Sequence, residues 1–277
     1  MNRKSILNLL ETHTILPKEL CMDEMILLKA KLNKLKLPKL LETLQERLKQ
    51  AIKEKWSYSQ FLDILLTDEM DRRNHSQFTK KLVKSHLQVN KTLETFDFSF
   101  NTKVYEPILK ELATCHFVEN KECVLIIGPS GVGKSHLAQS IGHEAIRKGY
   151  EVLFYRTYQP FNWISMGHGD GSYRKRLQQV IKVPLLILDD FGLQSLSEAS
   201  QMDLYEVICE RYEKAATIIT SNREFGEWQE IFANPLIGSA ALDRLIHRAT
   251  KLVIEGKSYR MEQFNKRSKK QSKETEK

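Results

Sequence analysis

The sequence predicts an α/β protein in which a doubly wound parallel sheet follows an all-helical N-terminal domain. Apolar residues recur at helical spacing over residues 1–95. From about residue 96, short apolar runs alternate with helical stretches, a rhythm typical of a parallel sheet. A glycine-rich loop joins the first of these runs to a helical pattern, which is the context that a phosphate-binding loop requires.

The N-terminal region is expected to form helices interrupted at Pro38. Leucines recur at helical spacing on both sides of it: Leu27, Leu28, Leu32 and Leu35, then Leu40, Leu41, Leu44 and Leu48. Ser57 or Ser59 is predicted to cap the next helix. Stripes of this kind most often form a core. The functional alternative is a helical bundle that contacts DNA or a partner protein, and it rests on the basic cluster of Lys80, Lys81 and Lys84.

Five apolar runs are expected to form the strands of the sheet. They cover residues 123–127, 151–155, 184–188, 216–220 and 251–254. Helical patterns separate them, among others over residues 136–148, 198–213 and 238–249. The aromatic segment 96–100 precedes the first strand and allows two interpretations. Its alternation suits an edge strand, and its aromatic surface suits a flap over an adenine ring.

The phosphate loop follows the first predicted strand and matches the pattern G-x-x-x-x-G-K-[ST]. Its residues are Gly128, Pro129, Ser130, Gly131, Val132, Gly133, Lys134 and Ser135. The glycines let backbone N–H groups point inward, and the helix that continues through His136 offers its N-terminal end to the same anion. Lys134 is expected to reach the β- and γ-phosphates of ATP, and the Ser135 hydroxyl to ligate Mg²⁺. His136 is included in the predicted nucleotide-binding stretch.

Two carboxylates end the third apolar run. Asp189 and Asp190 stand at the carboxyl end of a buried parallel strand, the edge at which open α/β sheets bind ligands. Asp189 is expected to hold Mg²⁺ through water, and Asp190 to orient or deprotonate an attacking water. The alternative is a solvated turn that continues into Phe191 and Gly192, but a neighbouring phosphate loop favours the catalytic interpretation.

Two further residues complete a candidate site for ATP hydrolysis. Asn222 ends the fourth run at the same sheet edge and is expected to contact the γ-phosphate or position water; an ordinary turn is the alternative. Arg244 lies in a later helical stretch and is predicted to act in trans on the ATP of a neighbouring subunit, as an arginine finger does. Its alternative role is a surface ion pair with Asp243.

The charge distribution suggests a polyanionic partner. The net charge of +8 divides into +5 over residues 1–100, −2 over residues 101–255 and +5 over residues 256–277. Basic flanks around a nearly neutral core indicate DNA as the partner, with solvated lysine-rich helices as the alternative. One stretch, 156–176, mixes aromatic and basic side chains and is a candidate for DNA contact: Arg156, Tyr158, Trp163, Tyr173, Arg174, Lys175 and Arg176.

Cysteine usage and hydropathy predict a cytoplasmic protein. The cysteines are scattered without a C-x-x-C pair, so neither a zinc site nor a disulfide framework is predicted: Cys21, Cys115, Cys123 and Cys209. No stretch approaches the roughly 20 apolar residues of a membrane span, and the N-terminus lacks the apolar centre of a signal peptide.

Five motifs stand out together: the phosphate loop, Leu188-Asp189-Asp190-Phe191-Gly192, Thr220-Ser221-Asn222, Asp243-Arg244-Leu245 and Gly256-Lys257-Ser258-Tyr259-Arg260. They resemble those of the IstB-like ATP-binding proteins, which are transposition helpers of bacterial insertion sequences and relatives of the DnaC helicase loaders in the AAA+ superfamily. Similar segments upstream, at 35–38, 61–65, 69–73 and 91–98, extend the resemblance over residues 30–262.

The resemblance implies an AAA+ ATPase domain over residues 96–262, a helical domain over 1–95 that binds DNA or a partner, and a basic tail over 263–277. It implies a homo-oligomer that binds DNA, uses ATP and Mg²⁺, and helps an IstA-like transposase to select its target. A DnaC-like helicase loader is the alternative function. A small-molecule kinase is a third possibility, for which the long helical N-terminus has no obvious use.

Two departures from the wider superfamily modify these expectations. Asp190 stands where most AAA+ proteins have a glutamate, one methylene longer, which implies slow hydrolysis and a long-lived ATP-bound assembly. The residues after the last predicted strand are too few for the helical lid, with its own arginine, that many AAA+ proteins carry.

Overall fold

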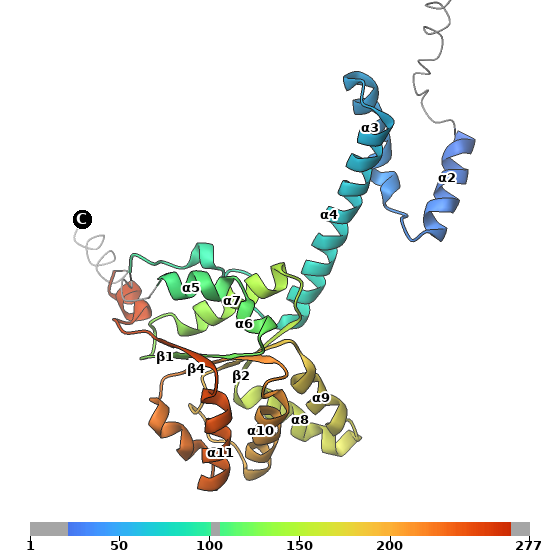
Figure 1. Cartoon of the computed structure of the whole chain (residues 1–277). Helices are drawn as coiled ribbons and strands as arrows, with labels where there is room; N and C mark the ends of the chain where they lie inside the picture. The colour runs from blue at the N-terminus through green and yellow to red at the C-terminus, as the bar shows by residue number, and fades with distance from the viewer. Residues whose placement is uncertain (1–21, 101–105, 267–277) are drawn as a thin grey trace, which may run out of the picture. The chain divides into compact units, whose positions relative to one another are not determined.

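The computed structural model describes residues 22–100 and 106–266, and Figure 1 shows their helices and strands. Contacts divide the chain into two compact units, Met1–Gln77 and Phe78–Lys277. The boundary between the two units lies after residue 77, before the boundary at residue 95 that the sequence suggested. The expectations for residues 1–21, and for the tail from residue 267 onward, lie outside the described residues.

The first unit is helical, as predicted. It contains α2 (Met22–Lys34), α3 (Leu40–Glu54) and the N-terminal part of α4 (Tyr58–Ser85). Pro38 lies in the break between α2 and α3. Ser57 is the cap of α4: its Oγ accepts from the Gln60 N–H at 3.2 Å, and the Gln60 side chain accepts from the Ser57 N–H at 2.9 Å.

The core of the first unit is small. Its buried members are Leu40, Leu44 and Leu65. Arg47 in α3 donates hydrogen bonds of 2.7 and 2.8 Å to both carboxylate oxygens of Asp68 in α4, which fixes these helices together. Leu27 and Leu35 are 64% and 66% exposed, so the predicted stripe is only partly core. In α2, Leu28 and Leu32 lie on one face of the helix and pack against the core. Leu27 directly precedes Leu28 in the sequence, so its side chain points to a different side of the helix.

The second unit is built on a five-stranded parallel sheet with the order β2-β3-β4-β1-β5, which confirms the predicted fold class. The strands are β1 (Cys123–Ile127), β2 (Val152–Arg156), β3 (Leu185–Asp189), β4 (Ala216–Ser221) and β5 (Ala249–Val253). Each lies within two residues of its predicted start. Among the described residues, no helix is both long enough and apolar enough to cross a membrane.

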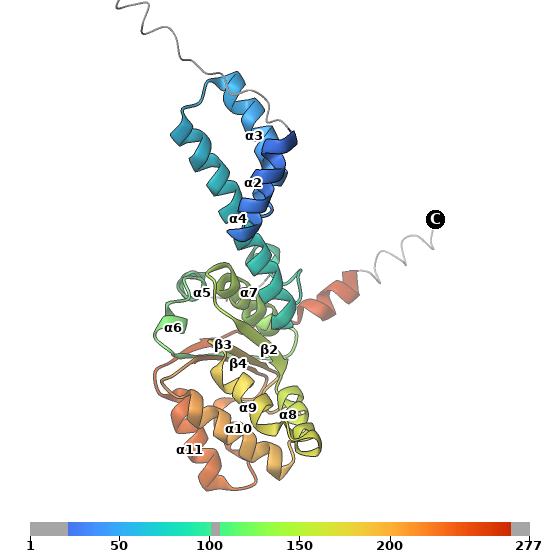
Figure 2. The same ribbon diagram turned by 90° about the vertical axis from the view of Figure 1, so that its right-hand side faces the viewer.

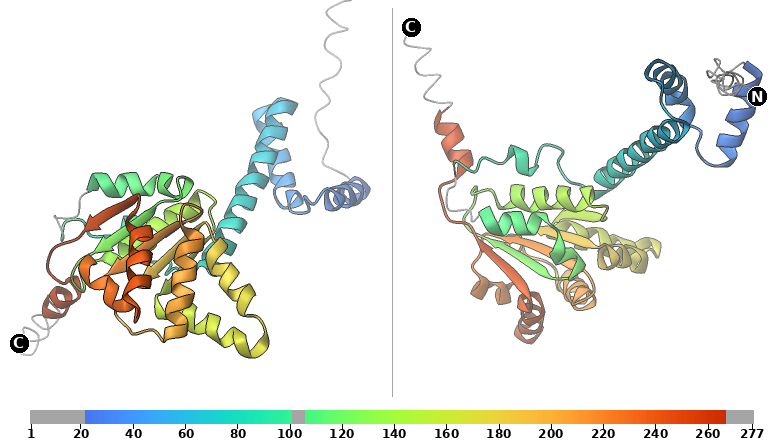
Figure 3. Two further views of the ribbon diagram at one scale, coloured as in Figure 1. Left: turned by 60° about the horizontal axis from the view of Figure 1, so that its bottom comes forward. Right: turned by 45° about the horizontal axis from the view of Figure 1, so that its top comes forward.

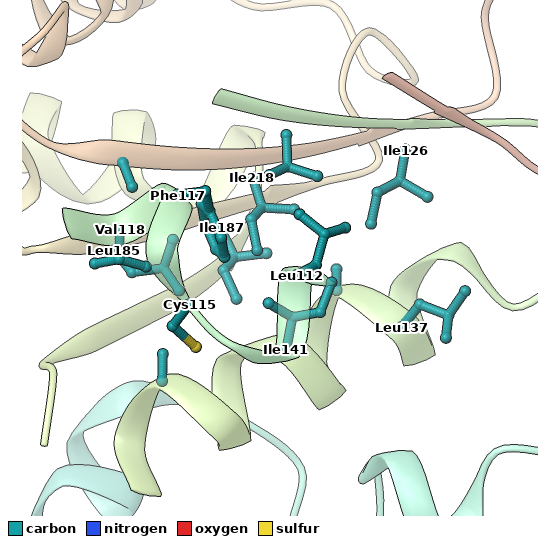
Figure 4. Close-up of a cluster of buried hydrophobic side chains, with 14 of the residues drawn as sticks. Leu112, Cys115, Phe117, Val118, Ile126, Leu137, Ile141, Leu185, Ile187 and Ile218 are labelled. Carbon is teal, nitrogen blue, oxygen red and sulfur yellow. The ribbon is translucent and has the colours of Figure 1, made fainter. Parts of the chain in front are cut away.

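Helices cover both faces of this sheet (Figures 1 and 2). One face carries α5 (Glu106–Ala113), α6 (His116–Glu119) and α7 (Lys134–Arg147). The other carries α8 (Tyr158–Asp170), α9 (Tyr173–Lys182), α10 (Glu198–Arg211) and α11 (Pro235–Ile246). Alternate strand residues supply the two cores, because successive side chains point to opposite faces. Thus Ile126 packs with Leu137 and Ile141 of α7 (Figure 4), whereas Leu125 belongs to the opposite cluster.

The aromatic segment 96–100 is not an edge strand, so that interpretation is wrong. Asp97 Oδ1 accepts hydrogen bonds from the N–H groups of Ser99 and Phe100, at 3.0 and 3.1 Å, and from the Ser99 hydroxyl at 2.6 Å. A short side chain that binds its own following backbone forms a turn in place of a strand ladder. The turn leaves Phe96 packed at the phosphate loop.

The strand order brings three strand ends to one edge of the sheet. In the register, Ile127 of β1 lies beside Ser221 of β4, and β4 in turn pairs with β3. The segments that follow these strands are the phosphate loop, the pair Asp189 and Asp190, and Asn222. Residues separated by more than 90 positions in the chain therefore meet at this edge.

Candidate functional site

The phosphate loop, residues 128–135, joins β1 to α7 and requires glycine at two positions. Gly131 and Gly133 have φ angles of +85° and +104°, which residues with a side chain rarely adopt. A Cβ on Gly131 would lie 2.1 Å from the Ser258 hydroxyl oxygen, and one on Gly133 would lie 2.8 Å from the ring of Phe96. Two distant segments thus support the loop from outside, and α7 begins at its end.

Lys134 is the first residue of α7, and its side chain is 5% exposed. Its ammonium group donates a hydrogen bond of 2.8 Å to the carbonyl oxygen of Pro129, within the loop. Burial lowers the pKa of Lys134, and the charges of Asp190 and Asp189 oppose that change. The loop therefore carries a buried cation with two carboxylates nearby, an arrangement suited to a phosphate chain and its counter-ion.

Asp189 ends β3 and is buried among hydrogen-bond donors. Its Oδ1 accepts a hydrogen bond of 2.5 Å from the Thr220 hydroxyl of β4. Burial raises the pKa of Asp189, while hydrogen bonds from the side chains of Thr220 and Ser135 lower it. The predicted metal-binding pair, Ser135 and Asp189, lines one cavity.

The donor set at this point fits Mg²⁺. Mg²⁺ prefers oxygen ligands and usually takes one or two from the protein, with water and phosphate oxygens completing its shell. The hydroxyl of Ser135 and the carboxylate of Asp189 are ligands of this kind. Within residues 22–100 and 106–266, no group of three or more His, Cys, Asp or Glu side chains could hold a metal ion.

Asp190 adopts a left-handed backbone conformation with φ of +56°, uncommon for a residue with a side chain. Its N–H donates to the Thr220 hydroxyl oxygen at 3.1 Å, so one threonine contacts both acids. Such backbone strain concentrates at functional sites. Sequence reasoning missed Thr220, although it lies two residues before Asn222 in the quoted Thr-Ser-Asn motif.

Residues 130–135 of the phosphate loop and the two acids line one cavity of about 520 Å³ at the carboxyl edge of the sheet. Most of the predicted nucleotide-binding stretch lines it: Ser130, Gly131, Val132, Gly133, Lys134, Ser135 and His136. Asp189, Asp190 and Asn222 also line it. Gly128 and Pro129 do not line the cavity; a Cβ on Gly128 would lie 2.1 Å from the Ile254 carbonyl oxygen, so this glycine allows close packing behind the loop.

An aromatic wall forms one side of the cavity. Phe96 packs edge-on against His136 with ring centroids 5.3 Å apart, and Phe100 packs edge-on against Tyr259 at 5.0 Å. His136 is held by the carbonyl oxygen of Thr92 at 3.0 Å, and burial lowers the pKa of its imidazole. Phe96, Phe100 and Tyr259 all line the cavity, next to the phosphate loop.

Arg244 lies elsewhere. It is not among the residues that line the cavity. Its guanidinium donates a hydrogen bond of 2.7 Å to the carbonyl oxygen of Ala240 and lies 5.9 Å from the centre of the Tyr205 ring. Between described residues, no ion pair joins it to Asp243. Arg244 therefore does not serve the site of its own chain in this structure.

Arg260, which was not predicted as a site residue, reaches the cavity. It belongs to a short helix over residues 259–266, and its guanidinium donates to the Ser130 hydroxyl at 3.2 Å. The N–H of Tyr259 donates to the carbonyl oxygen of Gly131 at 3.0 Å, which fixes the start of this helix against the loop. The segment after β5 thus supplies an arginine to the cavity. Its sequence signal was the quoted Gly-Lys-Ser-Tyr-Arg motif.

Comparisons with known proteins agree with this geometry. The family model described as IstB-like ATP binding protein matches residues 30–268. An ATP-binding protein of insertion sequence IS5376 from Geobacillus stearothermophilus is 36% identical over 239 residues, covering 86% of this chain and 95% of that protein. Its counterpart of insertion sequence IS21 from Pseudomonas aeruginosa is 35% identical, covering 85% of this chain and 89% of that protein.

Solved structures show the same fold at lower identity. The crystal structure of the DnaC helicase loader superposes with a TM-score of 0.51 at 24% identity, over 60% of this chain and 97% of that one. DnaA from Aquifex aeolicus, bound to AMPPCP, superposes with a TM-score of 0.53 at 23% identity, over 67% of this chain and 57% of that one. These likenesses support an AAA+ type fold.

Proposed function

The chain belongs to the family of IstB-like ATP-binding proteins, and from this premise we propose that it is a DNA-stimulated ATPase that assembles on DNA and helps a partner transposase to select its target. ATP binding and an insertion-sequence context follow from the family. Hydrolysis, DNA binding, oligomerisation and the transposase partner are the proposed part.

The observation that carries the enzymatic part is the meeting of Lys134, Ser135 and both acids in one cavity. In this proposal the N–H groups of the loop and the Lys134 ammonium bind the phosphates, and Ser135 and Asp189 hold Mg²⁺. A bound Mg²⁺ neutralises charge that develops on the phosphate oxygens. The aromatic wall of Phe96, Phe100 and Tyr259 offers apolar surface to the adenine.

The other residues are assigned to the hydrolytic step. Asp190 orients or deprotonates the attacking water, and Asn222 positions that water or contacts the γ-phosphate. Because aspartate is one methylene shorter than glutamate, Asp190 reaches less far toward the water, and slow hydrolysis is expected. Arg244 acts in trans, since it lines no part of its own cavity while an arginine finger can come from a neighbouring subunit.

The DNA-binding oligomer is supported by charge and by family. The basic flanks suit the phosphate backbone, which dominates affinity for nucleic acid. The alternative, a loader of a replicative helicase, rests on fold likenesses below 25% identity. The relatives that span most of the chain are ATP-binding proteins of insertion sequences, and they favour the transposition role.

The test measures ATP binding, ATP turnover with and without DNA, and target selection by the partner transposase in a plasmid assay. Lys134→Ala is expected to abolish ATP binding, stable assembly on DNA and targeted insertion, because it removes the cation at the β- and γ-phosphates. Lys110→Ala is the control, since Lys110 is exposed and pairs only with Glu106 of its own helix among the described ion pairs. Wild-type ATP affinity in Lys134→Ala would refute the site assignment.

A further inference from the structure

A second cavity, of about 1010 Å³, lies along β2, an edge strand of the sheet. We call it the β2 groove. It is formed by the end of α4, by β2 and by α8 and α9, which lie side by side (Figure 3). Six of its residues are used below: Lys84, His86, Tyr155, Trp163, Lys175 and Lys182.

The β2 groove is positively charged. Lys84, Lys175 and Lys182 come from two different helices, and all three are exposed. No ion pair between described residues uses any of them. Among the described residues that line the groove, Glu151 alone is acidic. Lysines that outnumber the acidic residues of a concave surface create a positive potential there, which favours an anionic chain.

Flat rings also line the β2 groove. His86 and Tyr155 have ring centroids 5.0 Å apart, and Tyr155 is half-buried. Trp163 is also half-buried, with the Arg176 guanidinium 5.3 Å from its ring centre. Of the stretch 156–176 proposed from the sequence for DNA contact, only Gln159, Trp163 and Lys175 line the groove. The other positive charges come from α4 and from Lys182, outside that stretch.

We propose that the β2 groove binds a single strand of DNA, with its phosphates on Lys84, Lys175 and Lys182 and its bases against Tyr155 and Trp163. A groove lined by both basic residues and aromatic rings suits a single strand of DNA, because its unpaired bases are free to stack on the rings. The bases of a duplex are stacked on one another and leave no flat face for the groove.

The groove shares two structural elements with the nucleotide cavity. Tyr155 of β2 lines the groove, and its neighbours Phe154 and Arg156 line the nucleotide cavity. After α4, His86 lines the groove and Gln88 lines the nucleotide cavity. A DNA strand bound in the β2 groove therefore contacts β2 and the segment after α4, and a nucleotide in the other cavity contacts the same two elements. We expect binding of DNA and binding of ATP to be coupled through these elements, an expectation that rests on the proposed ATPase function. Coupling between two sites is reciprocal: if ATP raises the affinity for DNA by some factor, DNA raises the affinity for ATP by the same factor.

The test uses the full chain and a fluorescein-labelled oligothymidine of about 12 nucleotides, within the span of known single-strand sites. The groove variant is Lys84→Gln/Lys175→Gln/Lys182→Gln. Its affinity is expected to fall at least ~10-fold, and the slope of log affinity against log salt to fall by about 2, since each phosphate contact contributes about 0.7. The control, Lys110→Gln/Lys214→Gln/Lys251→Gln, removes the same charge from exposed positions outside the groove and is expected to bind as the wild type does.

Tryptophan fluorescence locates the strand. The oligothymidine is expected to quench Trp163, and Trp163→Phe to remove that quenching, when both proteins also carry Trp56→Phe. The remaining tryptophan, Trp228, is fully buried. An unchanged affinity and salt slope in the groove variant, or an equal loss in the control, would overturn the proposal. So would a preference for a duplex of the same length without quenching of Trp163. Binding of fluorescent ATP in the absence of DNA reports on the nucleotide site alone. A failure of the proposed ATPase function can therefore be distinguished from a failure of the proposed DNA site.

Discussion

The Thr220 hydroxyl donates to Asp189 Oδ1 at 2.5 Å and accepts from the backbone N–H of Asp190 at 3.1 Å, so a single β4 side chain fixes both acids of the candidate site. Thr220 is fully buried. Its hydroxyl has one proton to donate, and that proton goes to Asp189, which favours the ionised form of this carboxyl.

The first prediction concerns Thr220→Val, which keeps the shape of the side chain and removes the hydroxyl. Loss of a hydrogen bond to a charged group costs about 1.5–3 kcal/mol, so Mg²⁺-dependent ATP binding is expected to weaken about 10- to 100-fold. Burial already raises the pKa of Asp189, and loss of this hydrogen bond raises it further.

The sign of the pH effect follows from the ligand chemistry. Mg²⁺ needs the ionised carboxylate, so binding is lost as the pH falls through the pKa of Asp189. The pH at which Mg²⁺-dependent ATP binding is half lost is therefore expected to be higher in Thr220→Val than in the wild type. Thr220→Ser keeps the hydroxyl and is the control. Identical pH profiles for the valine variant and the wild type would contradict the role given to Thr220.

A second prediction separates the two acids. Asp190→Asn is expected to keep ATP and Mg²⁺ binding, to reduce hydrolysis by at least ~100-fold, and to trap an ATP-loaded oligomer on DNA. Asparagine suits the test because it tolerates the left-handed backbone found at Asp190. Asp189→Asn is expected to weaken Mg²⁺-dependent ATP binding instead. Single-turnover hydrolysis together with equilibrium binding makes the comparison, and parental turnover by Asp190→Asn would show that its catalytic role is wrong.

A third prediction concerns Arg260. Arg260→Gln is expected to weaken ATP binding about 10-fold and ADP binding less, because Arg260 contacts Ser130 of the loop and its charge acts on Lys134, the residue assigned to the β- and γ-phosphates. Arg248→Gln is the matched control, since Arg248 pairs with Glu122 and lines no part of the nucleotide cavity. Titration with fluorescent ATP and ADP gives both affinities. Equal losses for ATP and ADP would argue against a contact near the γ-phosphate.

A fourth prediction concerns Arg244. Arg244→Ala is expected to keep ATP binding and to lose DNA-stimulated hydrolysis and assembly, because the residue lies outside its own cavity. Mixing it with Lys134→Ala protein should restore part of the activity, since some interfaces would then combine an intact loop with an intact arginine. Turnover is measured across mixing ratios, with mixed oligomers confirmed by crosslinking. Mixed oligomers without rescue would return Arg244 to a structural role in α11.

Local sequence patterns determined much of this protein. Apolar runs of strand length, broken by helical patterns, predicted the parallel sheet, and each strand starts within two residues of its expected place. The strand ending in Asp189 was also predicted correctly, and Asp189 lines one cavity with residues 130–135 of the predicted phosphate loop. These features were accessible because their physics is local: a glycine turn, the N-terminus of a helix and an apolar strand each depend on neighbours in sequence.

Tertiary structure alone decided which distant side chains meet. Thr220 reaches Asp189 because β4 lies beside β3 in the sheet, and strand order depends on the packing of the whole chain. Arg260 reaches the loop because the segment after β5 returns across it. Phe96 supports the loop because Asp97 turns the backbone. Such contacts join residues 30 to 130 positions apart, and their energies depend on three-dimensional distance, which no local periodicity encodes.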